Sequence, residues 1–105
     1  MSIRITTAMT IALLLAGGTA QAGGDAAAGE ALASMDCIDC HGEDGKGTED
    51  TPPLAGLDEA YILKQLEAYK SGDRTDEGGL MRMTVEELSD QDMANIAAYY
   101  ATLEK

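Results

Sequence analysis

Cys37-Ile38-Asp39-Cys40-His41 contains both cysteines and the single histidine of this 105-residue chain. Two residues separate the sulfurs, and the histidine follows the second sulfur directly. C-x-x-C-H is the attachment pattern of c-type haem, in which two thioethers join one edge of the porphyrin and the histidine ligates the iron. The sequence therefore predicts one covalent haem c, attached through Cys37 and Cys40 and ligated by His41.

Three other uses of two neighbouring cysteines compete with this interpretation. A structural zinc site needs four ligands, whereas the chain has only three Cys and His residues. A thioredoxin-like dithiol belongs to a βαβ pattern, and the sequence contains no evident strand. A disulfide between Cys37 and Cys40 is possible in an exported protein, but its loop is too small to stabilise a whole domain.

Residues 1–22 have the pattern of a cleaved signal peptide. One early charge, Arg4, precedes the apolar run 8–16 and the small-residue site Ala20-Gln21-Ala22. The alternative, an uncleaved anchor, needs roughly 20 apolar residues to cross a bilayer. We therefore expect export to the periplasm, a mature domain at residues 23–105, and no membrane span after cleavage.

The mature chain is poor in the residues that build a core. Of its 83 residues, 12 are Leu, Ile or Val and none is Phe, below the ~20% that marks a strongly charged chain as disordered. A large, mostly apolar cofactor would fill that missing centre. The net charge of −12 argues against binding to nucleic acid, which requires a basic surface, and against docking on anionic membranes.

Helical patterns surround the motif, and three main helices are predicted in an all-α domain. Asp25 caps the first, which reaches Met35; Asp58 caps the second, which reaches Lys70; and a Ser-x-x-acid capping box at Ser89 opens the third. Residues 42–53 and 72–87 are expected to be polar, glycine-rich loops. The expected buried faces are Ala28, Leu32 and Met35; Ile62, Leu66 and Tyr69; and Met93, Ile96, Ala97, Tyr100 and Leu103.

The second axial position of the iron has no histidine available. It is open to Met, Lys, a weak donor, water or nothing. Met93 belongs to the apolar stripe of the last helix, and Met35 lies close to Cys37, where packing is the simpler role. Met81 and Met83 remain, in the expected loop, either as ligands or as residues that pack on the porphyrin.

The motif, together with Pro52-Pro53-Leu54-Ala55-Gly56 and Leu88-Ser89-Asp90-Gln91-Asp92, resembles class I cytochromes c, above all the small monohaem bacterial c4-type and c-553-type proteins. The resemblance extends from Asp25 to about Leu103. It implies a class I cytochrome c-like domain in which three main helices surround one haem. It also implies that Gly29 permits a close helix crossing against Tyr99 or Tyr100.

The same resemblance implies a role for each residue of the haem site. Cys37 and Cys40 would form the thioethers, His41 would be the proximal ligand, and the Pro52 carbonyl would accept the imidazole N–H. The distal methionine of the family lies seven residues before the Leu of Leu-Ser-Asp-Gln-Asp, which corresponds to Met81, with Met83 as the runner-up.

These expectations describe a periplasmic one-electron carrier rather than an enzyme. Ligation by histidine and methionine raises the potential of the iron and leaves no open position for a substrate. The alternatives are a cytochrome subunit of a larger periplasmic oxidoreductase, such as a sulfur-compound dehydrogenase, and a haem enzyme or gas sensor with an open distal site. Redox partners with basic patches would suit the acidic charge, although a saline habitat explains that charge equally well.

Overall fold

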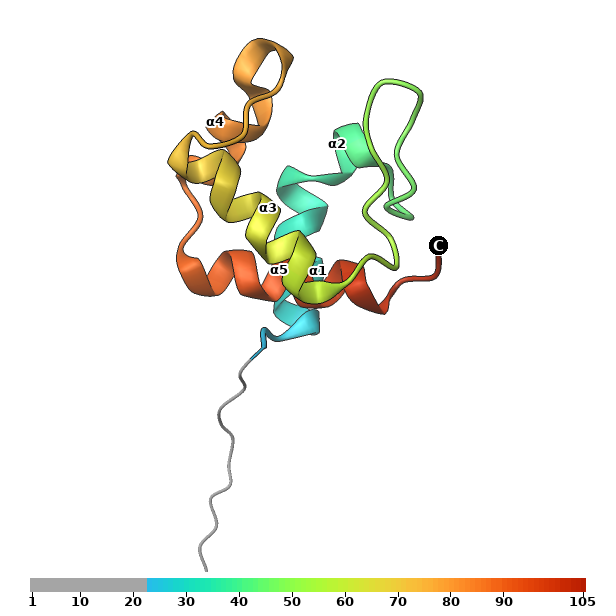
Figure 1. Cartoon of the computed structure of the whole chain (residues 1–105). Helices are drawn as coiled ribbons and strands as arrows, with labels where there is room; N and C mark the ends of the chain where they lie inside the picture. Colours follow the sequence, from blue (N-terminus) through green and yellow to red (C-terminus); the bar gives the residue numbers. More distant parts are fainter. Residues whose placement is uncertain (1–22) are drawn as a thin grey trace, which may run out of the picture.

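The computed structural model describes residues 23–105, and the expected signal peptide, residues 1–22, lies outside this part of the chain. The described residues form helices joined by loops, without strands, which confirms the all-α prediction (Figure 1). The elements are α1 (Ala26–Asp36), α2 (Ile38–His41), α3 (Glu59–Ser71), the 3-10 turn η1 (Glu77–Gly79), α4 (Leu80–Glu86) and α5 (Asp90–Thr102). Of the helices in residues 23–105, none is both long and apolar enough to cross a membrane.

The three longest helices begin at the capping residues that the sequence predicts. Asp25 accepts hydrogen bonds from two backbone amides of the first turn of α1, and Asp58 accepts one from the first turn of α3. Ser89 and Asp92 form a reciprocal capping box at the start of α5. Gly72 ends α3 in a left-handed conformation, which glycine adopts without steric cost.

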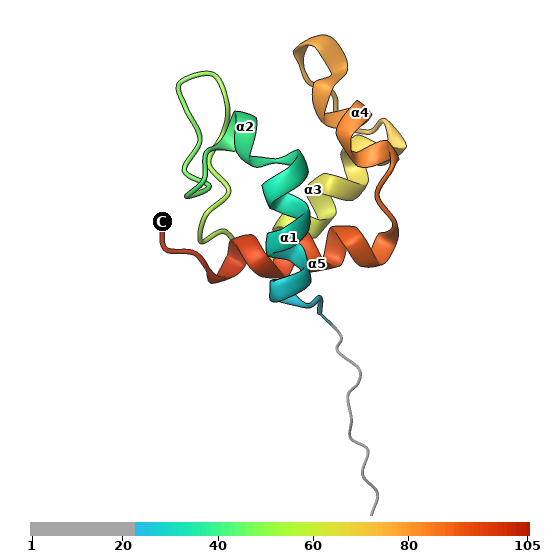
Figure 2. The same cartoon turned by 180° about the vertical axis from the view of Figure 1, so that it is seen from behind.

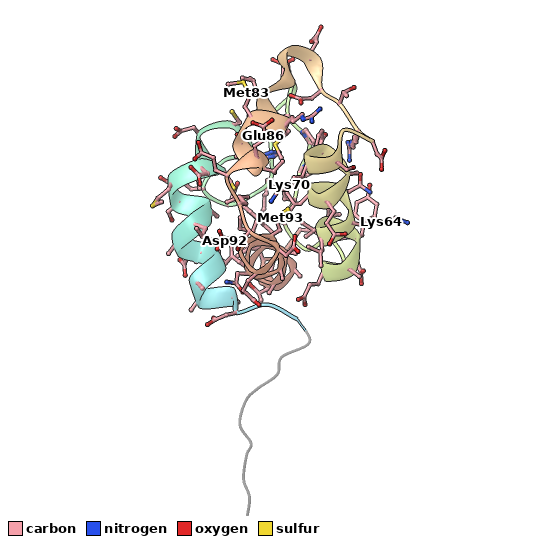
Figure 3. All side chains as sticks on the ribbon, turned by 90° about the vertical axis from the view of Figure 1, so that its left-hand side faces the viewer. Lys64, Lys70, Met83, Glu86, Asp92 and Met93 are labelled. Carbon is pink, nitrogen blue, oxygen red and sulfur yellow. The ribbon has the colours of Figure 1, made fainter. Side chains whose placement is uncertain are left out.

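α5 lies at the centre of the fold, between α1 and α3. Figures 1 and 2 show α1 crossing α5, and Figure 3 looks along α5 with α1 and α3 on either side. The buried apolar residues come mainly from α3 and α5 and include Ile62, Leu66, Tyr69, Val85, Leu88, Met93, Ile96, Ala97 and Tyr100. The predicted inner face of α3 is therefore confirmed, and so is that of α5 apart from Leu103, which is only partly buried.

The crossing of α1 and α5 occurs at Gly29, as expected, but its partner differs. A Cβ atom at Gly29 would lie 1.9 Å from the carbonyl oxygen of Asn95. The expected partners, Tyr99 and Tyr100, lie about one turn further along α5, so that part of the prediction is wrong. Because the two backbones meet here, the buried positions of α1 are small, Gly29 and Ala33.

This close contact also rotates α1 away from its predicted orientation. Met35, expected on the inner face, is 70% exposed, and Leu32 is only partly buried. The apolar-stripe prediction favoured the larger side chains. Because the backbones of α1 and α5 touch, the buried face of α1 has to be the one with small side chains. Larger side chains there would hold the two helices apart.

A second correction concerns residues 72–87, where the sequence favours a loop. Residues 80–86 form α4, so Met81 and Met83 lie on a helix rather than in an irregular segment. Leu, Met and Arg are good helix formers, and Val85 anchors the helix because its side chain is fully buried. The two preceding glycines, Gly78 and Gly79, concealed this short helix in the sequence.

Candidate functional site

A cavity of about 400 Å³ opens between the two sides of the molecule. α2 and the loop that follows it form one side, and α3 and α4 form the other, with α5 beneath (Figure 1). All the residues that the sequence assigns to the haem site, except the runner-up Met83, line this cavity: Cys37, Cys40, His41, Pro52 and Met81.

The two thiols are unpaired, and their environment does not suit a reactive dithiol. Cys37 is partly buried and Cys40 is exposed. Burial raises the pKa of the Cys37 thiol to about 11, and the nearby Asp36 adds to that rise. Redox-active cysteines instead have a lowered pKa. In residues 23–105 no three His, Cys, Asp or Glu side chains gather into a group that could hold a metal ion.

His41 is held at one ring nitrogen and free at the other. Its ring is 5% exposed, and its Nδ1 lies 2.9 Å from the carbonyl oxygen of Pro52. A carbonyl oxygen can only accept a hydrogen bond, so Nδ1 carries a proton, and in the neutral imidazole Nε2 then keeps its lone pair. This tautomer leaves Nε2 ready to ligate a metal.

Gly47, which the sequence analysis treated only as part of a loop, supports this arrangement. Its amide donates to the His41 carbonyl oxygen at 2.8 Å. A Cβ atom at Gly47 would lie 2.3 Å from the Thr51 carbonyl oxygen and 2.8 Å from that of Pro52, and its φ is +75°. Only glycine fits here, so this residue helps to place the carbonyl that orients His41. The sequence signal was a glycine six residues after the histidine.

The two candidate methionines of α4 have different surroundings. Met81 is partly buried, packs against the core and lines the cavity. Met83 is 64% exposed, and Figure 3 shows it with Glu86 on α4. Of the other two methionines in residues 23–105, Met93 lies in the core at 1% exposure, as expected, whereas the exposed Met35 does not pack as expected.

The cavity wall carries polar groups that suit a large cofactor. The Tyr100 hydroxyl is buried without a hydrogen-bond partner of ordinary geometry. Its polar neighbour is the Cys37 thiol, and burial raises the pKa of both groups. The chain thus provides two thiols, one free imidazole nitrogen and a thioether around one cavity, which fits haem c.

Arg74 adds a positive charge to the same wall, and Gln65, which also lines the cavity, holds that charge in place. The Arg74 guanidinium donates to the Gln65 side-chain oxygen at 2.5 Å and lies 4.8 Å from the centre of the Tyr69 ring. A held cation suits a cofactor that carries carboxylates, as haem does. Neither residue was predicted from the sequence, although an arginine within the acidic run 73–77 was a signal.

Comparison with known proteins agrees with a site for haem c. The family model described as Cytochrome c matches residues 26–104. Cytochrome c4 from Pseudomonas aeruginosa is 49% identical over 88 residues, covering 81% of this chain and 41% of that protein. Cytochrome c-554(548) from Halomonas halodenitrificans is 44% identical over 85 residues, covering 77% of this chain and 99% of that protein. The chain thus spans less than half of the c4 relative and nearly all of the c-554(548) relative.

Among solved structures, the thiosulfate dehydrogenase from Marichromatium purpuratum contains a similar domain. The TM-score is 0.73 at 37% sequence identity, and the match covers 84% of this chain and 21% of that chain. The similarity therefore concerns one small part of a larger protein.

Proposed function

The chain belongs to the cytochrome c family, and from this premise we propose that it carries single electrons in the periplasm through one haem. It is a class I cytochrome c close to the c4 type, and the cofactor of this family is covalently bound haem c. One C-x-x-C-H motif supports a single haem in this chain. The leader-like residues 1–22 support export.

The observation that carries the proposal is the set of donors around one cavity. His41, bound at Nδ1 by Pro52, lines it together with Met81 and both cysteines. When bound, the haem supplies an iron that gains and loses one electron. In our proposal Cys37 and Cys40 would hold the cofactor permanently, and His41 and Met81 would ligate its iron.

The residues around the cavity suit the transfer of an electron and not the conversion of a substrate. The Pro52 carbonyl fixes the ring orientation and basicity of His41. The soft thioether of Met81 favours the reduced state and raises the potential. With both His41 and Met81 bound to the iron, the site would offer no free position to oxygen or peroxide, so we propose a carrier rather than an enzyme.

Optical spectroscopy and mass spectrometry of the purified protein test this proposal. We expect an intact mass that corresponds to residues 23–105 plus one haem, and a ferric absorption band at long wavelength that is characteristic of sulfur–iron ligation. A potentiometric titration should follow a one-electron curve. Rapid carbon monoxide binding to the reduced native protein would instead show an open distal position and overturn the carrier assignment.

A second candidate, a cytochrome subunit of a larger oxidoreductase, is favoured by the similarity to part of the Marichromatium thiosulfate dehydrogenase. The two functions predict different behaviour in periplasmic extracts. A free carrier elutes at its own small size. A subunit co-elutes with a larger redox protein through size exclusion at moderate salt.

The proposed partners are redox proteins with basic docking patches. The chain has 19 acidic against 7 basic residues, and such a field steers association towards positive surfaces. The rate of electron transfer should then fall steeply as ionic strength rises. A rate that is independent of salt would favour the alternative, that the acidity reflects a saline habitat.

A further inference from the structure

We propose that Asp76 is a positioning residue for the distal iron ligand, because its carboxylate holds the first turn of α4 and thereby keeps Met81 at the cavity. This inference rests on the proposed ligation by Met81. Asp76 lies five residues before that methionine, and both line the cavity.

Three contacts join the Asp76 carboxylate to the first turn of α4. Oδ2 accepts from the amide of Leu80 at 3.1 Å. The amide of Met81 lies 3.2 Å from Oδ1 and 3.3 Å from Oδ2. The Asp76 carbonyl oxygen also accepts from the amide of Gly79 at 3.0 Å. The backbone of Met81 is therefore hydrogen-bonded directly to this carboxylate.

α4 depends on such an external cap. It has seven residues, and its N-cap, Gly79, has no side chain with which to accept a hydrogen bond. Helices this short are unstable alone in water, and the first amides of a helix have no partner within it. A carboxylate there makes charge-assisted hydrogen bonds and interacts favourably with the positive end of the helix dipole.

Two glycines allow Asp76 to reach the helix. Gly78 and Gly79 have φ values of +80° and +68°, in the left-handed region that other residues avoid. These two positions turn the chain back on itself, so that a residue before the turn faces the amides that follow it. A Cβ atom at Gly79 would meet nothing within 4 Å, so the requirement for glycine there is conformational.

The cap matters for the ligand because Met81 is only the second residue of α4. Val85, fully buried, fixes the helix one turn further on. Asp76 fixes its beginning. Without the carboxylate, the first turn would fray while Val85 stayed in the core, and Met81 would leave the cavity before the domain unfolds.

Asp76→Ala in the haem-loaded protein tests the proposal. Guanidinium titrations should follow the ferric sulfur–iron band and the far-ultraviolet circular dichroism in parallel. In the variant, we expect the band to disappear well before the helical signal does, with a roughly five- to thirtyfold larger population of the methionine-dissociated state. Carbon monoxide should bind the reduced variant faster in the same proportion.

Matched variants separate this role from general stability. Asp73→Ala removes the same charge from an exposed position on the same segment and should leave the band unchanged. Asp76→Asn keeps one acceptor oxygen and should lose less of the band than Asp76→Ala. Gly79→Ala disturbs the turn without a clash and should also make the band disappear before the helical signal. It provides the test if Asp76→Ala fails to fold.

The outcomes distinguish the two proposals. If wild type shows the band and Asp76→Ala behaves like Asp73→Ala, Asp76 has no positioning role, and the carrier function stands. If the band and the helical signal of Asp76→Ala vanish together, Asp76 is a structural cap and the inference is wrong. A wild type without the band overturns the ligation by Met81 itself.

Discussion

Gly29 of α1 and Asn95 of α5 meet backbone to backbone, with 1.9 Å between a Cβ atom built at Gly29 and the Asn95 carbonyl oxygen. The Asn95 side chain strengthens the crossing, since its Oδ1 accepts from the amide of Asp25 at 2.8 Å. The same oxygen accepts from Gln91 Nε2 of α5 at 2.8 Å, which holds the side chain in place. α1 ends at Cys37, its C-cap. The crossing therefore sets where the cysteine wall of the cavity lies relative to α5.

Gly29→Ala should destabilise the haem-loaded protein despite improving helix propensity. Alanine gains about 1 kcal/mol over glycine inside a helix. Here, however, the added methyl group overlaps a carbonyl oxygen of the neighbouring backbone, and overpacking typically costs about 1–3 kcal/mol or more. We expect a net loss of about 2 kcal/mol, a fall in Tm of roughly 8–16 °C for a domain of this size, measurable by circular dichroism.

An exposed position on the same helix provides the control. Ala31→Ser should change stability by no more than about 0.5 kcal/mol, as is usual for surface sites. A Gly29→Ala protein as stable as wild type would show that α1 and α5 do not meet backbone to backbone at this residue.

Met81→Ala should alter the haem site, and Met83→Ala should not. Met81 lines the cavity, whereas Met83 is 64% exposed on the same helix. Loss of Met81 should abolish the sulfur–iron band and lower the reduction potential, because the thioether favours ferrous iron. Met83→Ala should change neither. Spectroelectrochemistry of the two variants decides, and the reverse result would move the ligand to Met83.

The starts of the three long helices and the cofactor could be predicted because each depends on local chemistry. Asp58 and Ser89 cap their helices through hydrogen bonds to amides within three residues, so the information lies in adjacent sequence. The C-x-x-C-H motif, likewise, places three functional atoms within five residues. Such features do not depend on how distant segments pack.

The features that the sequence did not reveal depend on how segments pack in the folded chain or on the conformation of a turn. The exposure of Met35 follows from the Gly29–Asn95 contact, which joins residues 66 positions apart. α4 exists because Asp76 caps it across two glycines and because Val85 finds a place in the core. The helix propensity of residues 72–87 is lowered by the two glycines, and it contains no information about the Asp76 cap or the burial of Val85.

Preventing haem attachment should prevent folding. A cavity of about 400 Å³ separates α2 from α3 and α4, and only 12 of the 83 mature residues are Leu, Ile or Val. Closing such a cavity would require the helices to move far from their present contacts. Expression of Cys37→Ala/Cys40→Ala should therefore yield a protease-sensitive chain with weak helical circular dichroism. A cooperative thermal transition in this haem-free protein would contradict the prediction.

Arg74→Gln should lower the reduction potential. The Arg74 guanidinium lines the cavity, where Gln65 and the Tyr69 ring hold it in place. A positive charge near the iron favours the reduced state, which carries one positive charge fewer, so its removal stabilises the oxidised state. We expect a fall on the order of tens of millivolts, where about 59 mV corresponds to a tenfold change in the equilibrium constant of a one-electron couple.

Arg82→Gln is the matched control, because it removes the same charge from the exposed face of α4. Arg82 pairs with Glu86 at 3.7 Å, and both side chains are about half exposed, at 49% and 58%. Water and salt screen charges in such positions, so its effect on the potential should be several times smaller. Equal shifts in both variants, measured by potentiometry at one ionic strength, would mean that Arg74 acts only through the net charge and not as part of the cavity wall.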